Sequence, residues 1–337
     1  MKDTSSSYRL IDKDFLNRRD HQAFPIYVKE KMGNEERFVL FADRSEKHQN
    51  KIKMLLSSGC LEQKIYIHVD DRNAYFKQMS QHLKALSQKK LISHKVTTKK
   101  LFLAAREIVA DIYEEGVSKL MGDTADVVVE TMQSLFSETD IKFETMAKLV
   151  ANDITSYTHS VNVAFYSLAY GTHVRLKPAD LHALGVGALF HDIGLFSVPP
   201  EVLAKEGLFH DFGVLPSLSA NKNLSAEDVL YLKKHPIEGR KKLSDLNRYP
   251  DSVLDIVEQH HESWDGSGYP KKLIGNQISP LARICKVADS FDTLRNPRAY
   301  RPKNYTAFEA LNIMVTDLKG QFEPEILKTF IKIMGSS

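Results

Sequence analysis

The sequence predicts an α+β protein in which a small N-terminal α/β domain is followed by an all-α helical domain. Strand-forming runs rich in β-branched and aromatic residues occur early in the chain. From Thr98 onward the apolar residues follow helical spacing, and no strand signal of comparable length appears after residue 125. The 337 residues suffice for two domains of ordinary size.

The N-terminal domain is predicted from alternating strand and helix signals. Residues 24–29 and 36–42 predict a β-hairpin, because a glycine-containing turn separates them. Residues 45–59 predict a short helix, and residues 64–69 predict another strand. We expect residues 1–90 to form a regulatory or interaction domain.

A polar and basic stretch over residues 88–100 predicts a connector. Its charge is typical of a solvated linker, since no aromatic residues are interleaved as in a nucleic-acid-binding arm. We assign residues 91–124 to this connector and a linker helix, and residues 125–337 to the all-helical domain. Helices in that domain are predicted at residues 125–136, 141–170, 178–190, 226–244, 251–262, 281–294, 305–319 and 324–334.

The composition restricts the classes of partner and the compartment. Lys+Arg 46 against Asp+Glu 43 leaves a net charge of +3, too balanced to favour DNA or a membrane surface. The two cysteines, Cys60 and Cys285, form no CxxC pattern, which favours a reducing compartment. No apolar run approaches the ~20 residues of a membrane span. We therefore expect a soluble, cytoplasmic protein that binds neither DNA nor membrane. The sequence is compatible with a homodimer.

Several histidines and aspartates lie on apolar helix faces or at helix ends. Each alone is compatible with core packing, but so many together are hard to explain without metal. Imidazole and carboxylate without thiolate suit iron, manganese, zinc or cobalt. The predicted ligands are His159, His191, Asp192, His235, His260, His261 and Asp289.

Seven ligands exceed what one ion can use while keeping a substrate position open. We therefore predict two divalent ions bridged by Asp192. Adjacent side chains leave a helix about 100° apart, so His260 and His261 suit a helix end or a site broader than one ion. The first ion takes His159, His191, Asp192 and Asp289, and the second takes Asp192, His235, His260 and His261.

The order of these residues belongs to a longer, multi-part pattern. It comprises "HDIG" at 191–194, "HP" at 235–236, "HHESWDGSGYP" at 260–270 and "ARICKVADSFDTL" at 282–294. This pattern resembles the HD-GYP subgroup of the HD phosphohydrolase superfamily over about residues 140–335. The resemblance implies an all-helical fold, a two- or three-metal centre that is often iron or manganese, and hydrolysis of cyclic di-GMP to the linear dinucleotide or GMP in bacterial signalling.

The resemblance also gives roles to residues around the metals. Asp192 and a metal-bridging hydroxide would form the catalytic pair, because two cations lower the pKa of a shared water. Arg298 and Arg301 would hold the second phosphate of the ligand. Tyr269, presented by a turn that includes Gly268, would contact the ligand. Partners would be cyclic di-GMP and a protein bound through the N-terminal domain or through the loop that carries Gly268, Tyr269 and Pro270, called the GYP loop below.

The sequence departs from the family pattern in three places. Leu195 stands where relatives usually have a lysine, and Thr155 stands where three-metal relatives have a glutamate. We therefore expect two ions, and a weakly active or inactive cyclic di-GMP sensor remains an alternative, as does a hydrolase of another phosphoester. Residues 208–223 form an insertion that acts either as a lid or as a plain surface loop.

Overall fold

The computed structural model describes residues 7–16, 23–33, 35–45, 48–57, 64–87, 94–116, 118–138, 156–206, 224–295 and 305–335. The chain forms two compact units. The first unit comprises Met1–Glu107 with Leu120–Val128, and the second comprises Ile108–Lys119 with Val129–Ser337. The predicted α+β class is confirmed, since a four-stranded sheet lies near the N-terminus and the rest of the described chain is helical.

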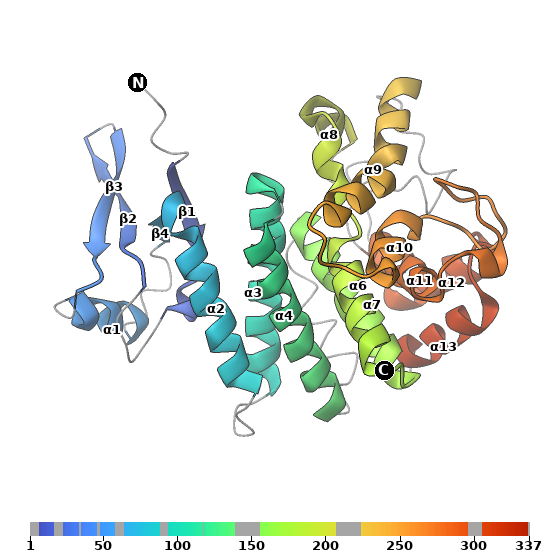
Figure 1. The fold of residues 1–337 in the computed structure, drawn as a ribbon, viewed down its shortest axis with the longest axis horizontal. Coiled ribbons are helices and arrows are strands. Elements are labelled where there is room, and N and C mark those ends of the chain that lie inside the picture. Colours follow the sequence, from blue (N-terminus) through green and yellow to red (C-terminus); the bar gives the residue numbers. More distant parts are fainter. Residues whose placement is uncertain are drawn as a thin grey trace. The chain divides into compact units, whose positions relative to one another are not determined.

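The sheet of the first unit is antiparallel throughout, in the order β1-β4-β2-β3 (Figure 1). Its inner face is aliphatic, because alternate residues such as Ile65 and Ile67 are buried. The predicted hairpin is present, whereas β1 was missed because it is only four residues long and exposes Leu10. The elements are β1 Tyr8–Ile11, η2 Lys13–Phe15, β2 Ile26–Met32, β3 Glu35–Ala42, α1 Gln49–Ser57, β4 Ile65–His68, η4 Val69–Asp71 and α2 Arg72–Ser87.

Two long helices follow, α3 His94–Glu115 and α4 Lys119–Glu138. The prediction of a connector over residues 88–100 is wrong from His94 onward. Residues 94–100 are polar except for Val96 and contain neither glycine nor proline, so nothing in them interrupts the helix that the apolar residues continue.

The remaining helices form the bundle of the second unit (Figure 1). They are α6 Ser156–His173, α7 Pro178–Phe190, η5 Ile193–Ser197, α8 Pro200–Glu206, α9 Ala226–Ser244, α10 Asp251–Gln259, η6 Gly275–Gln277, α11 Pro280–Arg295, α12 Ala307–Thr316 and α13 Pro324–Gly335. No strand occurs in the described part of this unit. Residues 141–155 of one predicted helix lie outside the described residues, and α8 was not predicted.

Helix α7 is the central element of the bundle and packs against α6, α10 and α11. Every residue from Ala183 to Phe190 is buried. Glycine is required at Gly187, because a Cβ atom there would lie 2.5 Å from the side chain of Ile256 in α10. The end of α7 is therefore held at a fixed depth in the core.

Helix α9 is fixed at its start and along one side. Ser225 and Asp228 form a capping box at its N-terminus. Arg240 donates a 2.6 Å hydrogen bond to Asp255 of α10, which ties the two helices together. Among the helices that the structure describes, none is long and apolar enough to cross a membrane.

Candidate metal centre

A buried cluster of five histidines and two aspartates lies where five segments of the second unit meet. None of the seven residues is more than 5% exposed. Two groups of ligand atoms are arranged so that each could hold a metal ion, and Asp192 belongs to both. His159 comes from α6, His191 and Asp192 from the end of α7, His235 from α9, His260 and His261 from the end of α10, and Asp289 from α11.

Three of the histidines are oriented by helix carbonyls that have no donor from their own helix. In an α-helix the carbonyl of Leu232 would accept from the N–H of residue 236, but Pro236 has none. The Nδ1 atom of His235 donates a hydrogen bond to that carbonyl instead, at 2.7 Å. Pro236 thus frees the carbonyl that orients the imidazole of His235. Because Nδ1 donates to this carbonyl, Nε2 of His235 carries the lone pair and faces the cluster.

Helix ends provide the same support for the other two histidines. Helix α7 ends at Phe190, and Nδ1 of His191 donates to the carbonyl of Ala188 at 2.8 Å. Helix α10 ends at Gln259, and Nδ1 of His260 donates to the carbonyl of Val257 at 2.8 Å. Both imidazoles therefore turn Nε2 toward the cluster.

The carboxylate of Asp192 lies between two pairs of histidines. Its Oδ2 atom lies 3.3 Å from Nε2 of His191 and 3.8 Å from Nε2 of His159. Its Oδ1 atom lies 3.4 Å from Nε2 of His235 and 3.6 Å from Nε2 of His260. Each oxygen of one carboxylate thus faces a different imidazole pair.

The imidazole nitrogens within each pair approach one another closely. The Nε2 atoms of His159 and His191 are 3.3 Å apart, and those of His235 and His260 are 3.2 Å apart. Where Nδ1 carries the proton, Nε2 presents a lone pair, so each pair needs a cation or a shared proton between its nitrogens.

Asp289 connects the two groups. Its Oδ1 atom lies 3.2 Å from Nε2 of His159, and its Oδ2 atom lies 4.0 Å from Nδ1 of His261. No hydrogen-bond donor of the described chain meets the buried Oδ2 atom. Burial raises the pKa of Asp289, but the hydrogen bond to His159 outweighs it and holds the pKa below the ordinary value.

His159 is the most strongly perturbed base of the cluster. Burial lowers the pKa of His159, but hydrogen bonds to Asp289 and Asp292 outweigh burial and raise it to about 10. Burial lowers the pKa of His260. The cluster therefore attracts positive charge at its His159 side, which a proton or a metal ion can supply.

The adjacent histidines occupy the turn after α10. Their ring centroids are 4.1 Å apart, and both belong to the group of four residues with Asp192 and His235. The ring of Tyr269 stacks on His261 at 4.7 Å with an interplanar angle of 20°. Tyr269 therefore lies directly beside the cluster.

Gly268 has a packing role of its own. A Cβ atom there would lie 2.3 Å from the backbone nitrogen of Ser263 and 2.6 Å from the carbonyl oxygen of His261. Only glycine lets the two arms of the loop approach so closely. A side chain at this position would push the backbone before Tyr269 away from His261.

Leu195 points into an apolar cluster with Val198, Val202 and Leu232, and it is buried. It offers the site no charge or proton. Arg298 and Arg301 lie outside the described residues, as do Thr155 and the insertion at 208–223.

Four buried polar residues around the cluster were missed in the sequence. Asp292 accepts hydrogen bonds from Nδ1 of His159 at 2.7 Å and from Asn162 at 2.9 Å. Asp292 follows Asp289 by three residues and Asn162 follows His159 by three residues, each on the same helix face as the ligand, so helical spacing could have identified them.

Glu262 accepts backbone N–H bonds from Lys271 at 2.6 Å and Leu273 at 3.0 Å, which holds the GYP loop in place. Lys286 is buried, and burial, partly offset by Asp289, Glu262 and Asp265, lowers its pKa to about 8.

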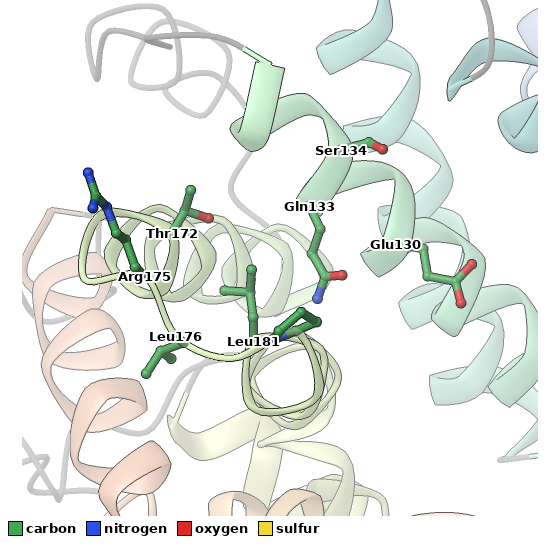
Figure 2. Close-up of a pocket in the computed structure, with 8 residues that line it drawn as sticks. Glu130, Gln133, Ser134, Thr172, Arg175, Leu176 and Leu181 are labelled. Atoms are coloured by element: carbon green, nitrogen blue, oxygen red, sulfur yellow. The ribbon is translucent and has the colours of Figure 1, made fainter.

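A separate cavity of about 420 Å³ lies at the other end of α6 (Figure 2). Its lining comes from α4, from the end of α6 and from the start of α7, and includes Glu130, Gln133, Thr172 and Arg175. Thr172 is 13 residues beyond His159 on α6, roughly 20 Å along the helix axis. This cavity contains none of the cluster residues.

Comparisons with known proteins agree with this geometry. The HD domain family model matches residues 142–326. A protein of Pseudomonas aeruginosa named a cyclic di-GMP phosphodiesterase is 32% identical over 192 residues, covering 56% of this chain and 42% of that protein. A protein of Thermotoga maritima that is also named a cyclic di-GMP phosphodiesterase is 27% identical over 253 residues, covering 73% of this chain and 64% of that protein. A Vibrio cholerae protein named a 3′3′-cGAMP-specific phosphodiesterase is 29% identical over 179 residues, covering 50% of this chain and 34% of that protein.

The chain spans less than two thirds of the length of each of these relatives. Among solved structures, Bd1817, a HDG"Y"P protein from Bdellovibrio bacteriovorus, aligns with a TM-score of 0.63 and 21% identity. The alignment covers 98% of this chain and 100% of that one, which shows a shared fold.

Proposed function

Because the chain belongs to the HD domain family and, within it, to the HD-GYP subgroup, we propose that it is a metal-dependent phosphodiesterase of cyclic di-GMP. The observation that supports this most is the placement of Asp192, whose two oxygens face two separate histidine pairs. A carboxylate in that position suits a bridge between two ions.

The residues present fit divalent metal. All the donors are imidazole nitrogens or carboxylate oxygens, the set that suits iron, manganese and zinc. Two pairs of imidazole nitrogens stand 3.2–3.3 Å apart, and a buried oxygen of Asp289 lacks a donor from the described chain. A cation at each pair would satisfy these atoms.

We assign the first ion to His159, His191, Asp192 and Asp289, and the second to Asp192, His235, His260 and His261. When bound, two such ions lower the pKa of a water and neutralise charge on a phosphodiester. The protein's own contribution is orientation: backbone carbonyls hold His191, His235 and His260, and Asp292 holds His159. Arg298, Arg301, Tyr269 and Gly268 remain our assignments for ligand contact.

A cyclic di-GMP sensor with little turnover is the second candidate. The observation that favours it is the burial of Leu195 among Val198, Val202 and Leu232, which leaves no proton donor at that position. The intact histidine cluster favours the enzyme. A related cyclic dinucleotide is a further substrate to test, since relatives named for cyclic di-GMP and for 3′3′-cGAMP both match this chain.

We also propose a location and a regulatory arrangement for the protein. We place the protein in the cytoplasm, as part of bacterial second-messenger signalling, with residues 1–90 as the regulatory or protein-binding domain and a homodimer as the assembly to test. The relatives are named for the phosphodiesterase, and the sheet-containing first unit offers none of the cluster residues.

The test is turnover by metal-loaded protein. Wild type is incubated with cyclic di-GMP and 3′3′-cGAMP while the linear product is followed, beside Asp192→Asn and, as a matched control, the exposed Asp245→Asn. We expect product from wild type and Asp245→Asn and none from Asp192→Asn. Metal and ligand retained by wild type without product would favour the sensor, and metal without ligand binding would contradict both.

A further inference from the structure

A cyclic dinucleotide has two phosphodiesters, and the histidine and aspartate cluster takes one of them. Resting on the proposed function, we propose that Lys233 is a further contact of the second phosphodiester, besides the arginines already assigned to it, and that Tyr269 keeps the ammonium group of Lys233 beside the cluster. The two phosphodiesters belong to one small ring, so the second stays within a side chain's length of the first.

The contacts form a chain from the cluster outward. Tyr269 stacks on His261, with ring centroids 4.7 Å apart. The Nζ atom of Lys233 lies over the same tyrosine ring, 5.6 Å from its centroid. One aromatic ring therefore separates the ammonium group from a predicted metal ligand.

The backbone of Lys233 is fixed while its side chain is exposed. Leu232 directly before it and His235 two residues after it are fully buried, the first against Leu195 and the second in the cluster. An exposed cation–π contact is weak, so the ammonium group can leave the ring for a phosphate oxygen, which offers a charge-assisted hydrogen bond.

Two other described lysines near the site, Lys271 and Lys286, already face acids. Lys271 forms an ion pair with Glu258 at 2.8 Å. Lys286 is buried, and the negative charges of Asp289 and Glu262 raise its pKa against the effect of burial. Lys233 pairs with no carboxylate of the described chain. Its ammonium group can therefore meet an incoming anion without first leaving a carboxylate.

The neighbouring residue supplies a matched control. Lys234 is exposed on the same helix, and its Nζ atom lies 5.9 Å from the ring centroid of Tyr231, which is outside the cluster. Lys233→Gln and Lys234→Gln remove the same charge and the same kind of contact. Only the first removes it beside His261.

The experiment uses the full, metal-loaded chain with two probes. Binding of cyclic di-GMP is measured by calorimetry, and hydrolysis of bis(p-nitrophenyl) phosphate, which has a single phosphodiester, is measured by absorbance. We expect Lys233→Gln to bind cyclic di-GMP about tenfold more weakly, with Lys233→Arg and Lys234→Gln close to wild type. Hydrolysis of the single phosphodiester should be unchanged in all three.

Each other result overturns the inference in a distinguishable way. Unchanged binding in Lys233→Gln overturns the role of Lys233 alone. An equal loss with both probes means that Lys233 acts on the cluster or on folding, and not on a second phosphate. A wild type that retains metal but binds no cyclic di-GMP overturns the proposed function and this inference together.

Discussion

The Nδ1 atom of His159 lies 2.7 Å from a carboxylate oxygen of Asp292, and the other oxygen of Asp292 accepts from Asn162. Both partners are buried. A single carboxylate one helical turn beyond Asp289 therefore fixes the imidazole of His159 from behind.

Replacing Asp292 with asparagine should weaken metal binding by about 10- to 100-fold, the usual effect of losing such a support. An amide oxygen carries no negative charge, so it is a weaker acceptor for the N–H of His159 than the carboxylate of Asp292. Metal affinity measured by competition with a chelator tests this, with circular dichroism as the check on folding. Wild-type affinity in Asp292→Asn would contradict the supporting role.

Gly194→Ala should destabilise the second unit severely. A Cβ atom at residue 194 would lie 1.8 Å from the carbonyl oxygen of His235 and 2.5 Å from the nitrogen of Gly239. Both are backbone atoms of α9, so the helix itself must move, and we expect a loss of at least about 3 kcal/mol in the free energy of unfolding. Thermal unfolding measures it.

The matched control for that experiment is Gly335→Ala, because a Cβ atom at residue 335 meets nothing within 4 Å. It should change stability by no more than about 1 kcal/mol. Equal melting temperatures for the two variants would mean that η5 and α9 do not pack as described.

Glu262→Gln should loosen the GYP loop without unfolding the bundle. The carboxylate of Glu262 accepts backbone N–H bonds from Lys271 and Leu273, and glutamine keeps only one acceptor. One partly buried N–H then loses its bond to the buried side chain of residue 262, at a cost of about 1–3 kcal/mol.

Hydrogen exchange at the amides of Lys271 and Leu273 reports this directly. We expect exchange at least about tenfold faster in the loop, with α7 unaffected. Glu325→Gln is the control, since Glu325 is exposed on α13. Unchanged exchange in the loop would show that Glu262 does not hold it.

The first unit should lose stability as the pH rises from about 4.5 to above 7. Burial raises the pKa of Glu107 to about 7, outweighing the hydrogen bond from Tyr75. The folded state then binds more protons than the unfolded state in this range, so deprotonation favours unfolding. The contribution is about 1–3 kcal/mol.

Glu107→Gln isolates this effect, because glutamine can accept from the N–H of Asp12 and donate to Tyr75 without titrating. Urea unfolding at pH 5 and pH 7.5, followed in the sheet, should show a smaller pH dependence for the variant. An identical pH dependence would mean that Glu107 does not titrate in this range.

Helical periodicity and motif spacing were sufficient to predict most of the second unit. Residues 178–190 and 226–244 were predicted with the bounds the structure has, because proline, serine and aspartate mark their starts. The start of helix α3 was placed too late, since the six polar residues and single valine before Leu101 gave no periodic signal. The four-residue strand β1 gave too short a pattern.

The candidate ligands were recognisable because each stands on an apolar helix face, at a helix end or before a proline. What the sequence could not supply were distances, such as those from Asp192 to the two histidine pairs, which depend on how α6, α7, α9 and α10 meet. Lys233 was missed for the same reason, since its partner Tyr269 is 36 residues away in sequence.

The most direct test of the central claim counts metal ions per chain. Wild type, His159→Ala and His235→Ala are purified anaerobically, reconstituted and analysed for iron, manganese and zinc. A centre in which Asp192 bridges two ions predicts two ions in wild type and about one in each variant, because each variant removes a ligand from one ion only. A single ion in wild type, or loss of every ion in both variants, would contradict the two-ion site.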